Sequence, residues 1–173
     1  DSAPALAVYE AEVLTRSLKG ERRIPISEWC TGPKKTALLP EEIVTAIELK
    51  LPAKKHAWCY MKLSRYDGED LAQGGIAVLA FSDNTYKLAV CALGPKPARC
   101  PKTEAVVNGN KLGEKLLSKA KEAILQEVSP ISDIRSSKEY RLHMTQIMLG
   151  RALETAVARL FGKGPKYGKE NIC

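Results

Sequence analysis

Apolar and polar residues alternate along much of the first half of the chain, and this period of two is typical of half-buried β-strands. The clearest run is 43–51, where every second side chain falls on one mainly apolar side. Strands are also expected in five segments with a strand-like pattern: 7–18, 22–26, 58–63, 76–81 and 86–93. A Gly-containing turn at 19–21 and the pair Asp83-Asn84 join four of these segments into two predicted hairpins.

The second half changes to a period of three to four residues, which is typical of amphipathic helices. Apolar side chains recur at this spacing over 112–128 and again over 140–160. A shorter helix is expected at 101–107, because proline is favoured in a first helical turn. Ser136–Glu139 has the pattern of a capping box and predicts the start of the last helix. Gly162 predicts its end.

Strands first and helices afterwards favour the α+β class, because α/β proteins alternate the two along the chain. We expect residues 1–162 to form one domain, in which a small antiparallel sheet is packed on one face by about three helices. The Lys- and Gly-rich residues 163–173 are expected to form a flexible basic tail. A chain of 173 residues is long enough to bury a core, so disorder of the whole chain is not expected.

The charge balance narrows the classes of partner. The chain has 27 basic and 20 acidic residues, a net charge of +7, which by itself suggests nucleic-acid binding. Many basic residues lie next to an acidic one, as in Glu21-Arg22 and Lys138-Glu139, which favours a solvated basic face. The acid-free stretch 87–102 keeps an acidic protein or an anionic ligand open as partners. No apolar run approaches the ~20 residues that span a bilayer, so no membrane partner is expected.

The cysteine and histidine content argues against a metal centre. None of the five Cys forms a CxxC pair, and His56 and His143 are far apart in sequence, whereas zinc and iron–sulfur sites need clustered ligands. An odd number of Cys without a secretion signal indicates a reduced, cytoplasmic protein. Residues 1–7 lack the pattern of a signal peptide and begin without Met, so we expect a fragment of a longer polypeptide.

The known motifs for nucleotide binding and hydrolysis are missing from the sequence. Neither G-x-G-x-x-G nor G-x-x-x-x-G-K-[ST] occurs, so there is no glycine-rich phosphate loop of a known kind. Gly74-Gly75 precedes an apolar run and is interpreted as a bend or bulge. G-x-S-x-G and H-E-x-x-H are also missing, and neither His lies near a candidate nucleophile in sequence. The sequence therefore indicates no catalytic residue.

Five blocks of residues, taken in order, resemble one family of enzymes. The blocks are GERRIPI at 20–26, TGPKKT at 31–36, LPEE at 39–42, KLSR with ED at 62–70, and SPISDIR with EYR and M at 129–144. Together they resemble the FAD-binding medium subunits of the xanthine dehydrogenase and carbon monoxide dehydrogenase family of molybdenum hydroxylases. The resemblance covers nearly the whole chain except the tail, and it implies the fold of that family's C-terminal domain.

The resemblance also implies where FAD is bound. The family's glycine-rich loops for the pyrophosphate lie upstream of the point where this chain begins, which accounts for their absence here. Family contacts with the flavin fall on Asp1, Val44 and Lys62, although many relatives have Leu at the position of Val44. We expect Val44 and Lys62 on neighbouring strand ends that face one cleft, with the loop 63–73 bordering the ring. The Lys62 ammonium would favour a reduced flavin, which carries negative charge along one edge.

The implied partners are the other parts of a multi-subunit enzyme. A large molybdopterin subunit hydroxylates the substrate, two [2Fe–2S] clusters in a small subunit pass electrons to FAD, and NAD or another acceptor takes them. This chain would contribute to the flavin step and contact the upstream FAD-binding domain of its own subunit. A non-catalytic assembly domain that holds an acidic partner on a basic surface remains an alternative. Nucleic-acid binding is the least favoured interpretation, and we expect no nucleic-acid partner.

Overall fold

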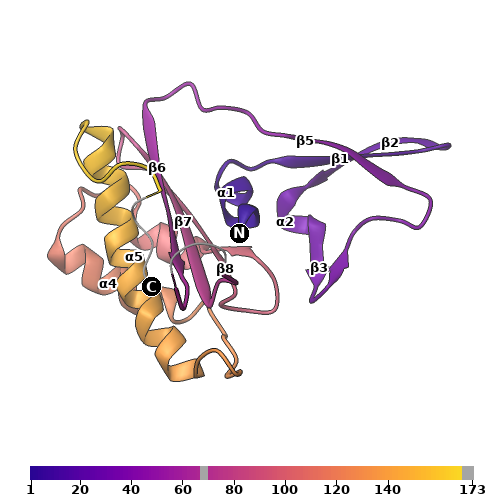
Figure 1. Ribbon diagram of the computed structural model, residues 1–173. Coiled ribbons are helices and arrows are strands. Elements are labelled where there is room, and N and C mark those ends of the chain that lie inside the picture. The colour runs from indigo at the N-terminus through magenta and orange to yellow at the C-terminus, as the bar shows by residue number, and fades with distance from the viewer. Residues whose placement is uncertain (67–69, 169–173) are drawn as a thin grey trace.

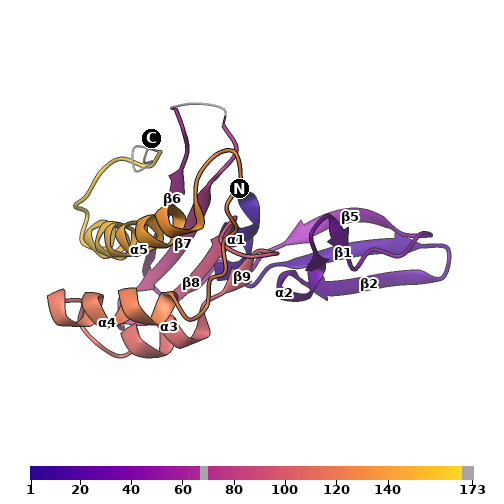
Figure 2. The same ribbon diagram turned by 90° about the horizontal axis from the view of Figure 1, so that it is seen from below.

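The computed structural model describes residues 1–66 and 70–168, which form a body and a long arm that projects from it (Figure 1). The arm comprises residues 12–48 and is built mainly from short strands. The body comprises the N-terminal helix and residues 56–160, and its four-stranded sheet has helices on both faces (Figure 2). The chain is therefore α+β, as the order of its sequence patterns predicts.

The arm is a three-stranded antiparallel sheet in the order β2-β1-β5, with a short helix and a two-stranded hairpin beside it. Its elements are β1 (Glu12–Ser17), β2 (Gly20–Pro25), α2 (Ile26–Trp29), β3 (Cys30–Gly32), β4 (Lys35–Thr36) and β5 (Ile43–Glu48). The β1–β2 hairpin confirms the predicted one, and Gly20 has a φ of 130° where β2 begins. The β3–β4 hairpin lies in a segment for which the sequence patterns predict no strand.

The body sheet has the strand order β6-β7-β8-β9, and all its neighbours are antiparallel. Its strands are β6 (His56–Leu63), β7 (Gly74–Phe81), β8 (Tyr86–Cys91) and β9 (Ala98–Arg99). The first three lie where the sequence predicts strands, and β7 is buried along its whole length. Because β7 lies between two strands and between two layers of helix, its small and aliphatic residues need no polar side.

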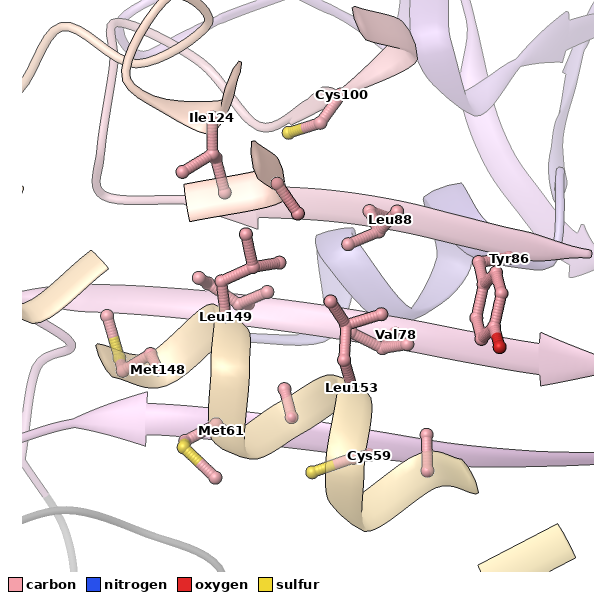
Figure 3. Close-up of a cluster of buried hydrophobic side chains, with 14 of the residues drawn as sticks. Cys59, Met61, Val78, Tyr86, Leu88, Cys100, Ile124, Met148, Leu149 and Leu153 are labelled. Atoms are coloured by element: carbon pink, nitrogen blue, oxygen red, sulfur yellow. The ribbon is translucent and has the colours of Figure 1, made fainter. Parts of the chain in front are cut away.

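Three helices cover one face of the body sheet, as the sequence predicts. They are α3 (Pro101–Val107), α4 (Glu114–Ile124) and α5 (Lys138–Leu160). Met148, Leu149 and Leu153 of α5 are fully buried in one core with Val78 of the sheet, and Ile124 of α4 belongs to the same core (Figure 3). Removal of this apolar surface from water is the main contribution to the stability of the body.

The opposite face of the body sheet is covered by α1 (Ser2–Val8), which the sequence patterns did not predict. The buried side chains of α1 pack against Ala77 and Leu79 of β7. The expectations of helices on one face only, and of a strand beginning at residue 7, are therefore wrong. The segment is rich in Ala, and Pro4 lies in the first turn, where a helix does not need its missing N–H.

The expected single sheet is also wrong, because the strands of the first half divide between two sheets. β1, β2 and β5 form the sheet of the arm, whereas β6 begins the sheet of the body. Residues 49–55 connect β5 to β6 without a helix or strand. An alternating pattern predicts a half-buried strand, but it does not determine which strands become neighbours.

Helix α5 begins with a hydroxyl cap close to the predicted position. The Ser137 side chain accepts a hydrogen bond of 3.1 Å from the Tyr140 amide. Ser136, the first residue of the predicted capping box, instead accepts a hydrogen bond of 2.8 Å from Arg141 Nε. A cap of this kind contributes about 1 kcal/mol. The predicted end of the helix is confirmed, since α5 ends at Leu160.

Candidate functional site

Lys62 lies near the end of β6 and points to the face of the body sheet that α1 covers. Because strand side chains alternate, Cys59 and Met61 face α5, whereas Tyr60 and Lys62 face the other side. Lys62 Nζ lies 2.8 Å from Asp1 Oδ2, and the Lys62 side chain is only 13% exposed. The structure therefore brings together two of the three residues selected from the sequence, since α1 begins beside the end of β6.

The surface beside Lys62 is shaped by a glycine. Gly75 lies between Lys62 and Cys91 in the strand register. A methyl group on Gly75 would lie 2.6 Å from Tyr60 Oη and 2.8 Å from Cys91 Sγ, and these two atoms are 3.6 Å apart, within the range of a weak hydrogen bond. Gly74 and Gly75 lie in continuous register with β6, so the expected bend or bulge is wrong. Close approach of two side chains is the reason for glycine at 75.

Burial makes the Tyr60 and Cys91 side chains poor nucleophiles. Burial raises the pKa of the Tyr60 phenol, and the neighbouring Cys91 raises it further. Burial likewise raises the pKa of the Cys91 thiol and outweighs the lowering effects of the Tyr60 contact and the positive charge of Lys62. Both groups therefore remain protonated at neutral pH, and they shape the site rather than react in it.

An apolar groove of about 370 Å³ lies between α1 and β6. Its lining includes Ser2, Leu6, Tyr9, Leu51, Trp58 and Tyr60. The lining residues Ser2 and Tyr60 lie within two residues of Asp1 and Lys62 along the chain, so the ion pair lies beside the groove. Apolar walls with the Lys62 ammonium beside them suit a flat, mainly apolar ring that carries negative charge along one edge.

Trp58, which lines the groove, belongs to a cluster that holds the chain after α5. The rings of Trp58 and Tyr167 are stacked with their centroids 4.5 Å apart, and the Arg159 guanidinium carbon lies 4.1 Å from the Tyr167 centroid. Arg159 also donates a hydrogen bond of 2.8 Å to the Trp58 carbonyl. Part of the predicted tail is therefore held against β6. Residues 169–173 lie outside the described residues, and the flexibility of the tail remains a prediction.

Val44, the third selected residue, lies apart from Asp1 and Lys62. It lies on β5 of the arm, opposite Thr15 of β1, and is 43% exposed. Because β5 and β6 belong to different sheets, the expected placement of Val44 and Lys62 on neighbouring strand ends is wrong. The predicted flavin contact of Val44 remains a prediction, as do those of Asp1 and Lys62.

Two of the motif blocks meet in an ion pair within the arm. Glu42 is 8% exposed and accepts hydrogen bonds from Arg22 Nη2 at 2.7 Å and from the Leu39 amide at 2.9 Å. The Arg22 guanidinium holds the pKa of Glu42 at about 2. This pair ties β2 to the segment before β5, so these conspicuous charged residues have a structural role.

The charged loop after β6 is described except for residues 67–69. The Arg65 amide donates a hydrogen bond of 2.8 Å to Asp70 Oδ2, and Arg65 Nη2 lies 3.5 Å from Asp70 Oδ1. The amide of Arg65, followed by its guanidinium, lowers the pKa of Asp70. The Gln73 amide donates to the Leu63 carbonyl and closes the loop. Its predicted position beside a flavin ring remains a prediction.

The described residues offer neither a metal site nor a membrane-spanning helix. No group of three or more His, Cys, Asp or Glu side chains there could hold a metal ion. No helix among the same residues combines the length and apolar character needed to cross a bilayer. His56 has ring contacts with Tyr9 and Phe81, and its Nδ1 lies 2.8 Å from the Lys54 carbonyl oxygen, so it has a packing role.

Comparison with known families identifies the chain. Residues 58–156 match the family described as the CO dehydrogenase flavoprotein C-terminal domain, and residues 1–53 match the FAD binding domain in molybdopterin dehydrogenase. The chain belongs to the family of FAD-binding medium subunits of xanthine and CO dehydrogenases. The resemblance inferred from five sequence blocks is thereby confirmed. The range 1–53 ends in the connection between β5 and β6, and the range 58–156 begins within β6.

Individual relatives agree with this membership. The xanthine dehydrogenase FAD-binding subunit of Escherichia coli O157:H7 is 33% identical over 94% of this chain and 58% of its own length. The nicotine 6-hydroxylase medium subunit of Paenarthrobacter nicotinovorans is 31% identical over 89% and 55%. The chain thus spans little more than half the length of these relatives. A structure of carbon monoxide dehydrogenase from Hydrogenophaga pseudoflava matches with a TM-score of 0.86 at 28% identity, covering 92% of this chain and 56% of that one.

Proposed function

We propose that this chain forms the C-terminal part of the FAD subunit of a molybdenum hydroxylase and helps to hold the flavin. The observation that carries the proposal is the Lys62–Asp1 ion pair beside an apolar groove. When bound, FAD supplies redox chemistry that links an electron donor to an electron acceptor. The role of this chain is to bind and orient the ring and to set the charge beside it, without a catalytic residue of its own.

The residues around the groove fit a flavin ring. Tyr60 and Trp58 offer apolar contacts for a flat ring, and Lys62 offers a cation for the edge that carries negative charge. Asp1 holds the Lys62 side chain in place, and its carboxylate also offsets part of the lysine charge. The field at the ring therefore depends on both residues of the pair. Val44 would contribute a third contact from the arm.

The proposed partner of the arm is the upstream part of the FAD-binding domain whose family model matches residues 1–53. Ile43, Val44 and Ile47 of β5 are all at least 43% exposed, and contiguous exposed apolar residues mark interaction surfaces. That domain would supply the glycine-rich loops for the FAD pyrophosphate. Residues 1–162 would complete the flavin site from the other side, with 163–173 as a basic tail.

The proposed complex has two further partners. A large subunit with molybdopterin would hydroxylate the substrate, and a small subunit with [2Fe–2S] clusters would pass electrons to the flavin. NAD or another acceptor would then remove them. One relative is a nicotine 6-hydroxylase subunit and another is a carbon monoxide dehydrogenase medium chain. The named relatives belong to enzymes with different substrates, which supports a substrate site in another subunit.

Flavin content and potential of the full-length subunit test this proposal. We expect one FAD per subunit after reconstitution, measured by absorbance. Lys62→Met should lower the flavin reduction potential by about 30 mV, since that shift corresponds to about 1.4 kcal/mol for two electrons and a charge-assisted hydrogen bond is worth a similar amount. Asp1→Asn should raise the potential, because it leaves the lysine charge uncompensated. This opposite sign separates an electrostatic effect from general damage to the site.

Lys87→Met is the matched control for this experiment. Lys87 is also an ion-paired and largely buried lysine, 2.8 Å from Glu10, but it lies near the other end of the same sheet. Its replacement should leave the flavin potential unchanged. A colourless full-length subunit after reconstitution would contradict the proposal and favour the alternative of a non-catalytic assembly domain.

A further inference from the structure

The chain turns back on itself directly after α5. Gly162 has a φ of 70°, which glycine adopts more easily than other residues, and the Lys163 amide donates a hydrogen bond of 2.9 Å to the Ala158 carbonyl. Gly164 also has a positive φ, and a methyl group on it would lie 3.3 Å from the Ala158 side chain. Residues 162–168, which we call the strap, therefore fold back against the last turns of α5 (Figure 1).

Arg159 of α5 binds the strap to β6. Its guanidinium donates hydrogen bonds of 3.1 Å to the Pro165 and Lys166 carbonyls and of 2.8 Å to the Trp58 carbonyl. β6 is an edge strand in the part of the chain that the structure describes, so its outer carbonyls need partners from outside the sheet. A planar guanidinium can hold several oxygens in fixed directions, as a lysine ammonium does not. Arg159 thus joins a helix, a strand edge and the strap.

The strap reaches around this edge to the face of the sheet that α1 covers. Arg159 belongs to α5, which packs on the opposite face. Alternation along β6 directs the Trp58 side chain to the α1 side, together with that of Tyr60. Tyr167 stacks on Trp58 with the ring centroids 4.5 Å apart. The ring of Tyr167 therefore lies on the side of the sheet that carries the groove.

Tyr167 lies close to residues of both walls of the groove. Trp58 belongs to the β6 wall, and Tyr9 belongs to the lining at the end of α1. Burial raises the pKa of the Tyr9 phenol, and the nearby Tyr167 raises it further. The Arg159 guanidinium carbon lies 5.8 Å from the centroid of the Trp58 ring, within the range of a cation–π contact. Trp58 is 38% exposed, and these contacts with Tyr167 and Arg159 limit the motion of its ring.

We propose that Arg159 and Tyr167 are positioning residues, which hold Trp58 as a fixed wall for the flavin ring. The inference rests on the proposed function, because it takes the ring in the groove to be that of FAD. A wall that is already ordered loses little conformational entropy when a planar ring binds, so the ring is held longer. The charge beside the ring is that of Lys62. The strap should therefore set how long FAD is held, while its reduction potential stays the same.

The rate of FAD release from the reconstituted full-length subunit tests this role, measured by the rise in flavin fluorescence after dilution. Tyr167→Ala should raise the rate about fivefold, which is the effect of one aromatic pair, and should leave the flavin potential unchanged. Tyr167→Phe should keep the parent rate, because stacking requires the ring. Tyr140→Ala is the matched control, since Tyr140 is 46% exposed and lies in the first turn of α5, at the opposite end from the strap.

Trypsin cleavage after Lys166 tests the strap without reference to FAD. The unaltered subunit should be cut there slowly, because Arg159 holds the Pro165 and Lys166 carbonyls. Arg159→Met should be cut about fivefold faster or more, since cleavage requires local opening of the segment. It should also release FAD faster, in the same direction as Tyr167→Ala. Mass spectrometry of the products measures the cleavage rate.

Three results would overturn the positioning role. They are a parent rate of FAD release for Tyr167→Ala, an equal increase for Tyr140→Ala, and a Tyr167→Phe rate as high as that of Tyr167→Ala. Equal cleavage of Arg159→Met and the unaltered subunit would show that the strap is not held against β6. Absence of FAD from the unaltered subunit would instead contradict the proposed function, and slow cleavage after Lys166 would still support the strap, so the two failures remain distinguishable.

Discussion

Gly75 determines how closely the Tyr60 and Cys91 side chains approach one another at the Lys62 end of the body sheet. These residues come from three strands, and only strand pairing places them side by side. The missing side chain at position 75 leaves room for the Tyr60 hydroxyl to lie 3.6 Å from Cys91 Sγ. The surface beside Lys62 therefore depends on a residue that contributes no functional group of its own.

Gly75→Ala should destabilise the protein by about 1–3 kcal/mol, because the added methyl group overpacks a rigid part of the sheet. Its Cβ would lie 2.6 Å from Tyr60 Oη and 2.8 Å from Cys91 Sγ, so both side chains must move. Urea denaturation of the two proteins measures the change. Gly94→Ala is the control, since its Cβ would lie 3.8 Å from the nearest atom, and its effect should stay below about 1 kcal/mol. Equal stabilities for the Gly75 variant and the parent would refute the packing argument.

The loop before α5 shows how one element is positioned by another. Arg141 of α5, buried and close to Asp133, fixes a loop that has no regular structure of its own. The amides of the turn and then Arg141 hold the pKa of Asp133 at about 2, below the usual value of 3.8. The ionised carboxylate is thus a structural component of the loop, and the motif around it has a conformational role.

Lowering the pH over a defined range should remove the stabilising contribution of Asp133 in the loop before α5. Since the folded pKa of Asp133 is lower than its unfolded value, its stabilising contribution is complete above about pH 5 and is lost as the pH falls from about 4 to about 2. Asp133→Asn should be less stable than the parent at pH 7, and the difference should shrink at pH 3. Urea midpoints at pH 7, 5 and 3 measure this. A difference that stays constant over this range would show that ionisation of Asp133 does not stabilise the fold.

The whole molecule combines a well-buried body with an arm that has little core. The body places β7 and much of α5 out of contact with water, whereas every residue of β5 is exposed. In the arm, Arg22 and Glu42 form a buried ion pair, and β1 contributes the buried Val13. An arm of this kind needs a partner to cover its apolar side, and the proposed partner is the upstream part of the FAD-binding domain that residues 1–53 match.

Amide hydrogen exchange should be faster in the arm than in the body. Amides of β5 and β1 should exchange at least tenfold faster than those of β7 in this chain, because few buried contacts oppose local opening of the arm. In the full-length subunit, exchange in β5 should slow, while β7 should change little. Mass spectrometry of peptides from the two strands measures both rates. Unchanged exchange in β5 of the full-length subunit would argue against an upstream domain that covers the arm.

The sequence by itself determined the fold class, most of the strands and helices, and the family. Alternation over 58–63 and the helical period over 140–160 are local properties, because a half-buried strand or helix must place its apolar side chains on one side. The motif blocks are likewise local strings of residues. Lys62 could be selected from its block, but its ion pair with Asp1 could not be predicted.

Only the tertiary structure decided which segments became neighbours. It placed β5 and β6 in different sheets, which separates Val44 from Lys62, and it laid α1 on the second face of the body sheet. Periodicity reports whether a side chain is buried, but not against which segment it packs. The contact between Asp1 and Lys62 joins residues far apart in the chain, so it depends on the complete packing of the body.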